Sequence, residues 1–196
     1  MCVAKMQLWS AWLGILVLTV ASGLSPSTSR GQEKNEPPKE LELSYEAFDQ
    51  RPGGGWRKIA EEGKLLEAAR LIDRYEKEKK GLEEWQRVNL RFHAGQLYAF
   101  ANQNDQALAR FKTALRAKEP ADSPISWNAY VRATIAFLER DRKKLTELRE
   151  EIATGPKHQG VVPNLDVVDR LIEHFDEPYS VAYGGKKKSK SGAEES

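Results

Sequence analysis

The sequence predicts an all-α protein in which helical hairpins stack on one another. Apolar residues recur at intervals of three and four along most of residues 41–183, as they do on the buried face of an amphipathic helix. Glycine, proline and helix-capping residues interrupt this pattern, so they divide it into separate helices. Equivalent positions in three successive pairs of helices, Ala68, Ala107 and Leu145, lie 39 and 38 residues apart. This near-constant interval indicates a repeated unit.

Residues 1–23 have the pattern of a cleaved signal peptide. Lys5 precedes an apolar run over residues 8–20, and the small residues Ala21, Ser22 and Gly23 follow it. The run is shorter than the roughly 20 residues that cross a bilayer. We therefore expect export, periplasmic or secreted, and no stable membrane span after cleavage. The alternative is a protein anchored by an uncleaved N-terminal segment.

The cysteine content and the charge exclude several classes of function. Cys2 is the single cysteine, so cleavage would leave no disulfide, thiolate metal site or cysteine nucleophile. The 31 basic residues nearly balance 29 acidic ones, and no dominant basic face predicts a nucleic-acid partner. Residues 24–40 and 184–196 are too poor in apolar side chains to order themselves, so we expect a disordered linker and a disordered lysine-rich tail.

The helical domain is expected over residues 41–183. The glycine run 53–55 separates its first apolar residues from the first hairpin, and Gly63 and Gly81 mark further turns. Asn104 is expected to cap the fourth helix, and Ser123 with Pro124 to start the fifth. The helices predicted in this way cover residues 56–62, 64–79, 82–101, 104–118, 124–138, 142–153 and, as a C-terminal cap, 165–175.

The central hairpin, residues 91–120, carries a recognisable series of small and aromatic residues. Successive intervals of three, nine, four and three residues separate Gly95, Tyr98, Ala107, Phe111 and Ala114. The lack of a side chain at Gly95 would let the partner helix come close. This series resembles a tetratricopeptide repeat. The resemblance implies a right-handed solenoid of about three TPR-like hairpins, closed by the C-terminal helix, with connections longer than those of the family.

The same resemblance places the first helix of each hairpin on a concave face. Helical spacing then gives two stripes on that face, and their aromatic rings and amides suit an extended peptide. Phe92 and Trp127 are expected to be half-exposed there; the alternative is that the rings belong to the core. The candidate partner-binding residues are Asn89, Phe92, Gln96, Phe100 and Gln103 on one helix and Trp127, Tyr130 and Thr134 on the other.

These features predict an exported, non-catalytic scaffold that binds a protein or peptide and needs no metal or cofactor. No catalytic motif is found, and His93 is expected to pack within the central hairpin. One alternative is a cell-envelope hydrolase that uses acidic residues with His158 and His174. Another is a structural subunit of an envelope assembly, in which residues 178–183 fill the groove of their own chain.

Overall fold

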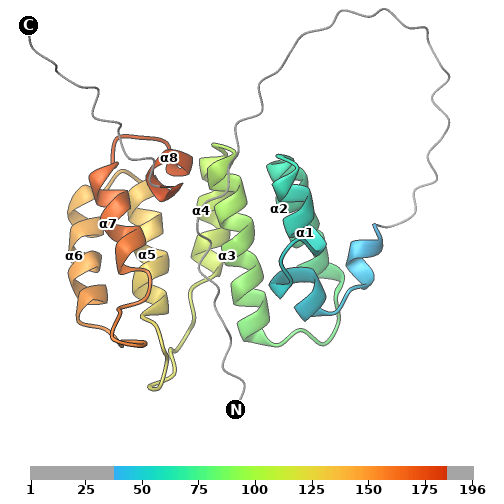
Figure 1. Cartoon of the computed structure of the whole chain (residues 1–196), viewed down its shortest axis with the longest axis horizontal. Coiled ribbons are helices and arrows are strands. Elements are labelled where there is room, and N and C mark those ends of the chain that lie inside the picture. The colour runs from blue at the N-terminus through green and yellow to red at the C-terminus, as the bar shows by residue number, and fades with distance from the viewer. Residues whose placement is uncertain (1–37, 185–196) are drawn as a thin grey trace, which may run out of the picture. The chain divides into compact units, whose positions relative to one another are not determined.

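A computed structural model of the chain describes residues 38–184 (Figure 1). The predicted signal peptide, nearly all of the predicted linker and the tail after Gly184 lie outside the described residues. Within them the protein has eight α-helices, one short 3-10 helix and one π-helix, and no strand, which confirms the all-α prediction. None of the described helices is long and apolar enough to cross a membrane.

The helices follow one another with short connections, except between α4 and α5 and between α6 and α7. Their bounds are η1 Lys39–Glu42, η2 Glu46–Gln50, α1 Gly55–Glu61, α2 Leu65–Glu78, α3 Glu84–Phe100, α4 Asn104–Thr113, α5 Trp127–Leu138, α6 Arg142–Ala153, α7 Leu165–Glu173 and α8 Tyr179–Gly184.

Local chemistry explains several of these ends. The backbone N–H of Glu83 donates to Oε1 of Gln86 at 2.9 Å, which satisfies a free donor where α3 begins. Asp141 caps α6, because its Oδ1 accepts from the backbone N–H of Lys144 at 2.9 Å. Asn104, expected as the cap of α4, is instead the first residue of that helix.

The fourth helix ends at Thr113 and not at Lys118, and the cause lies in the next helix. The indole Nε1 of Trp127 donates to the carbonyl oxygen of Ala114 at 2.8 Å. The Asn128 side chain accepts from the backbone N–H of Arg116 at 2.8 Å and donates to its carbonyl oxygen at 2.9 Å. These bonds hold residues 114–116 in place of further helical turns. The expected start of α5 at Ser123 is likewise wrong by a few residues.

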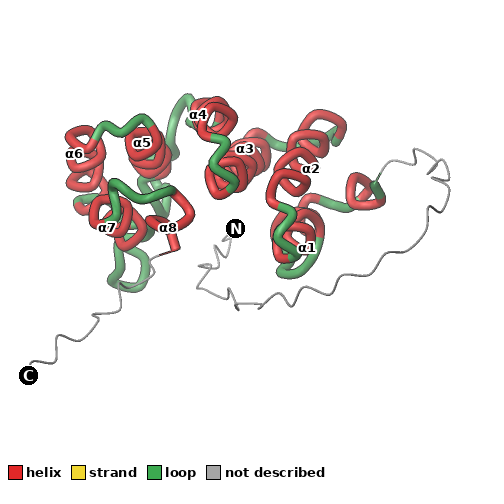
Figure 2. Tube along the Cα trace, turned by 90° about the horizontal axis from the view of Figure 1, so that it is seen from above, coloured by secondary structure: helices red, strands yellow, loops and turns green. Residues whose placement is uncertain are grey.

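Each α-helix from α1 to α7 packs against the one that follows it, and α7 also contacts α5. Figure 2 shows the short α8 beside α7 and α3, and both contacts are present in the structure. Within the second hairpin the crossing of α3 and α4 is tight. A Cβ atom on Gly95 would lie 2.9 Å from ring atoms of Phe111, so the predicted close approach at this glycine is confirmed.

Candidate functional site

One face of α3 carries polar and aromatic side chains that are not fully buried. Trp85, Asn89, His93, Gln96 and Phe100 follow at intervals of four, four, three and four, so they form one line along the helix. We call this line the α3 stripe. Two different segments of the chain cover it, one at each end.

The segment around η2 covers the N-terminal half of the α3 stripe. Nδ2 of Asn89 donates to the Tyr45 hydroxyl at 3.2 Å, and Nδ1 of His93 lies 2.8 Å from Oδ1 of Asp49. The Trp85 ring meets the Tyr45 ring edge-on, with centroids 5.3 Å apart, and remains 42 % exposed. Residues separated by some 44 positions in the chain are thus joined by polar contacts.

Asp49 is the centre of this N-terminal cover. Its side chain is fully buried, and its two carboxylate oxygens accept from His93, from Nε1 of Trp56 at 2.9 Å and from Nε2 of Gln50 at 2.6 Å. Burial alone would raise the pKa of the carboxyl. The positive charge and hydrogen bond of His93, together with the Trp56 bond, outweigh burial and lower the pKa of Asp49 to about 2. Asp49 is therefore a buried carboxylate whose charge is compensated by fixed donors.

Gly55, a position at which only glycine fits, brings Trp56 close to Asp49. Gly55 begins α1 with φ +48°, and a Cβ atom there would lie 2.1 Å from the carbonyl oxygen of Phe48. Only glycine allows the chain to pass so close to η2. The run at residues 53–55 is thus an ordered turn that brings α1 back onto the π-helix.

The α8 segment covers the C-terminal half of the α3 stripe. The Phe100 ring centroid lies 5.2 Å from that of Tyr179 and 5.4 Å from that of Tyr183. Tyr179 is buried with its ring 5.9 Å from Phe137 on α5, and the polar side chains of Gln96 and Thr134 lie beside it. Burial raises the pKa of the Tyr179 hydroxyl well above its ordinary value. Residues 178–183 therefore occupy the predicted concave face.

The expected half-exposure of the predicted aromatic stripe is wrong. Phe92 is 5 % exposed and Trp127 3 %, and Tyr130 and Thr134 are also buried. The ring centroid of Phe92 lies 5.1–5.4 Å from those of Phe111, Trp127 and Tyr130. These rings fill the space between the second and third hairpins. Of the candidate residues, Asn89, Gln96, Phe100 and Gln103 are the ones that are not fully buried.

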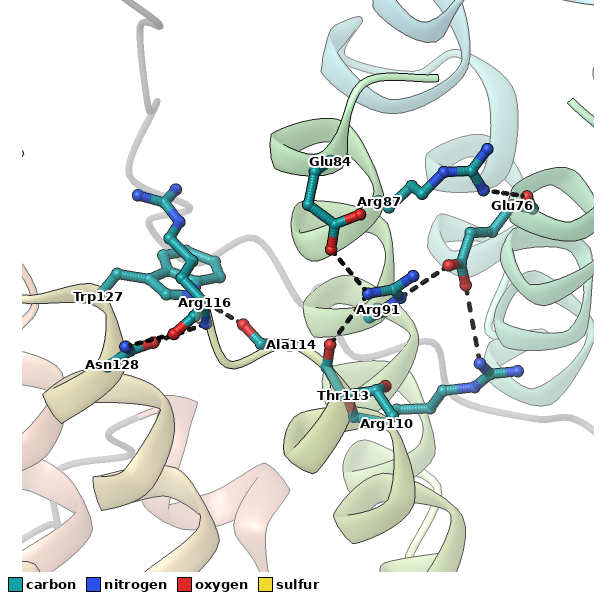
Figure 3. A network of polar contacts seen from close by, with 10 residues as sticks. All are labelled: Glu76, Glu84, Arg87, Arg91, Arg110, Thr113, Ala114, Arg116, Trp127 and Asn128. Atoms are coloured by element: carbon teal, nitrogen blue, oxygen red, sulfur yellow. Dashed lines mark hydrogen bonds and ion pairs between the residues drawn. The ribbon is translucent and has the colours of Figure 1, made fainter. Parts of the chain in front are cut away.

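A second polar network joins α2, α3 and α4 on another face (Figure 3). Arg91 connects all three helices: its Nε lies 2.7 Å from Glu76 Oε1, and its Nη1 lies 3.1 Å from Glu84 Oε1 and donates to the Thr113 carbonyl oxygen at 3.2 Å. Arg87 donates to the backbone carbonyl oxygen of Glu76 at 2.9 Å. Nη1 of Arg110 lies 3.7 Å from Oε2 of the Glu76 carboxylate. The charges compensate one another, so this network is a brace between helices.

Two of the acidic residues considered for a hydrolase form ion pairs with arginines. Asp166 pairs with Arg170 and Asp169 with Arg149, both at 2.8 Å. His158 is exposed, and its backbone forms an isolated bridge with Val161. In the part of the chain that the structure describes, no group of three histidine, cysteine or acidic residues is placed to hold a metal ion.

Comparison with known proteins gives no match to this chain. No protein-family model, no curated protein and no solved structure is similar to it.

Proposed function

We propose that this chain is an exported, non-catalytic scaffold that binds a protein or peptide segment on the α3 stripe. In this proposal α1–α2, α3–α4 and α5–α6 are three TPR-like hairpins of a right-handed solenoid, and α7 is its capping helix. The regular packing of each helix on the next supports the arrangement, as does the glycine–phenylalanine contact between Gly95 and Phe111.

The observation that carries the proposal is the way the C-terminal half of the α3 stripe is filled. Gln96 and Phe100 on α3 and Thr134 on α5 lie against Tyr179 of a six-residue helix. A face that accommodates one short segment through aromatic and amide side chains has the chemistry of a peptide-binding face. The buried rings of Phe92 and Trp127 lie behind this face and hold the second and third hairpins together.

The same observation favours one other function. If α8 never leaves the α3 stripe, the groove is filled by its own chain, and the protein is a structural subunit of an envelope assembly. The two functions differ in whether another protein reaches Gln96.

Site-specific photocrosslinking in the exporting cells separates them. A photoreactive amino acid at position 96 is compared with one at the exposed position 150 of α6, in the full chain. We expect a crosslink to a second protein from position 96 and none from position 150. Crosslinks from position 96 that reach only residues of the same chain would contradict binding and support the structural role. The N-terminus of the exported protein, expected near Leu24, is read from the same sample.

A further inference from the structure

We infer that α8 is a releasable internal ligand: it occupies the α3 stripe until a partner segment of the same chemistry displaces it. This inference rests on the proposed function and deepens it, because it names the class of partner. The partner segment is a short helix that carries two aromatic residues four positions apart, as Tyr179 and Tyr183 are in α8.

The order of α8 depends on its contacts. A helix of six residues is far below the length at which an isolated helix is stable in water. Its buried residues are Tyr179 and Ala182, and Tyr183 is half-buried. Since α8 is held by α3, α5 and α7, it loses its helical structure when those contacts are lost. Folding and docking of α8 are therefore one event.

The polar contacts to the backbone of this segment are not specific for its sequence. Arg140 donates to the carbonyl oxygens of Phe175 and Glu177, and Nε of Arg170 donates to the carbonyl oxygen of Tyr183 at 3.2 Å. Every peptide offers such carbonyl oxygens. The selectivity of the face therefore lies in the two tyrosine rings. Both pack against Phe100, Tyr179 also packs against Phe137, and the hydroxyl of Tyr183 interacts with that of Tyr130. A segment from another protein with rings at the same spacing meets the same requirements.

Covalent attachment gives α8 an advantage over any partner. A tethered segment competes as if it were present at a concentration in the millimolar range. A partner displaces α8 only when the ratio of its concentration to its dissociation constant exceeds the same ratio for the tethered segment. Weakening α8 should therefore increase the apparent affinity for a partner. This dependence is the property to measure.

The test uses the full chain and a fluorescent peptide with the sequence of residues 176–184. We expect the peptide to bind the double variant Tyr179→Ser/Tyr183→Ser at least about tenfold more tightly than it binds the wild type, because its own α8 no longer competes. A peptide with both tyrosines replaced by alanine should not bind. Equal binding to wild type and variant would overturn the inference, as would no binding to a variant whose circular dichroism shows a folded domain.

A milder pair of variants keeps the inference testable if the double variant does not fold. Tyr183→Ser removes one ring of α8 and leaves the receiving face unchanged, whereas Ser180→Ala changes an exposed residue of α8. We expect tighter binding of the peptide to Tyr183→Ser than to Ser180→Ala, and equal binding to the two would overturn the inference. Tighter peptide binding to the variants without a crosslink to a second protein from position 96 contradicts the proposed function alone. A crosslink to a second protein without tighter peptide binding to the variants contradicts this inference alone.

Discussion

The two halves of the α3 stripe are covered in chemically different ways. At the N-terminal half a buried carboxylate, Asp49, accepts hydrogen bonds from three side chains. At the C-terminal half α8 contributes aromatic rings, and its hydrogen bonds run from arginines to backbone carbonyl oxygens. The first cover requires particular residues at every position. The second requires a segment of suitable shape.

This difference has an energetic consequence. Opening the N-terminal cover would leave a charge and several donors without partners in a buried site, which is costly. Opening the C-terminal cover exposes apolar surface but strands no buried charge. The N-terminal cover is therefore a fixed part of the fold, and the C-terminal cover is the part that can exchange.

The largest effect is expected from removing the centre of the fixed cover. Asp49→Ala leaves the donors of His93, Trp56 and Gln50 without their acceptor, so the free energy of unfolding should fall by about 3–5 kcal/mol. Glu46→Ala, an exposed change in the same π-helix, is the control and should stay within about 0.5 kcal/mol. Urea denaturation measures both. A loss below about 1 kcal/mol for Asp49→Ala would show that the cover is not held by its carboxylate.

The next effect is on the pH dependence of stability. The pKa of Asp49 is lowered from an ordinary value of 3.8 to about 2, so the folded protein binds a proton less readily than the unfolded chain. The resulting stability, about 2 kcal/mol, is present above pH 4 and is lost as the pH falls through about 2. Asp49→Asn should lack this contribution. The measurement is the melting temperature between pH 5 and 2. If it falls equally for wild type and Asp49→Asn, the prediction is wrong.

A smaller loss is expected at the exchangeable cover, although Tyr179 is as deeply buried as Trp56. Because α8 can leave the surface as a unit, truncation of Tyr179 cannot cost more than the free energy that docks α8. Tyr179→Ala should therefore lower the free energy of unfolding by about 1–2 kcal/mol, whereas a buried phenylalanine such as Phe111 should cost about 3–5 kcal/mol. Hydrogen exchange provides a second measurement: amides of residues 179–184 should exchange much faster than those of α3. Equal protection of the two would mean that α8 is a fixed part of the core.

The smallest effect is expected at the open end of the α3 stripe. Trp85 is 42 % exposed, and its ring contacts that of Tyr45. Trp85→Ala should cost under about 1 kcal/mol, since little buried volume is vacated. A larger loss in the same denaturation assay would place Trp85 among the residues that hold the fixed cover.

The sequence predicted those parts of the fold that depend on neighbouring residues. Periodicity located α2, α3 and α6, and the spacing of Gly95 and Phe111 identified a contact that the structure shows. Periodicity also identified which residues share a face of α3. It did not show what covers that face, because the covering residue Asp49 lies 44 positions from His93.

The missed features all depend on distant contacts or on very short elements. Helical spacing predicts which residues share a face of a helix, but it does not predict what packs against that face. The expected half-exposure of Phe92 and Trp127 is wrong because each ring packs against the other. The early end of α4 is imposed by Trp127 and Asn128, more than ten residues further along. The six residues of α8 are too few to show a helical period.

The bonds from Trp127 and Asn128 to the backbone of residues 114–116 also separate the length of the connection between α4 and α5 from the placement of the two helices. The angle between the second and third hairpins is set at these bonds, on the near side of the connection. The residues between them, 117–122, are mostly exposed and carry no part of that joint. The number of residues in the connection is therefore independent of the distance between the two hairpins. The connection can gain or lose residues while the helices on either side keep their packing, which is compatible with the interval of 38 residues from Ala107 to Leu145.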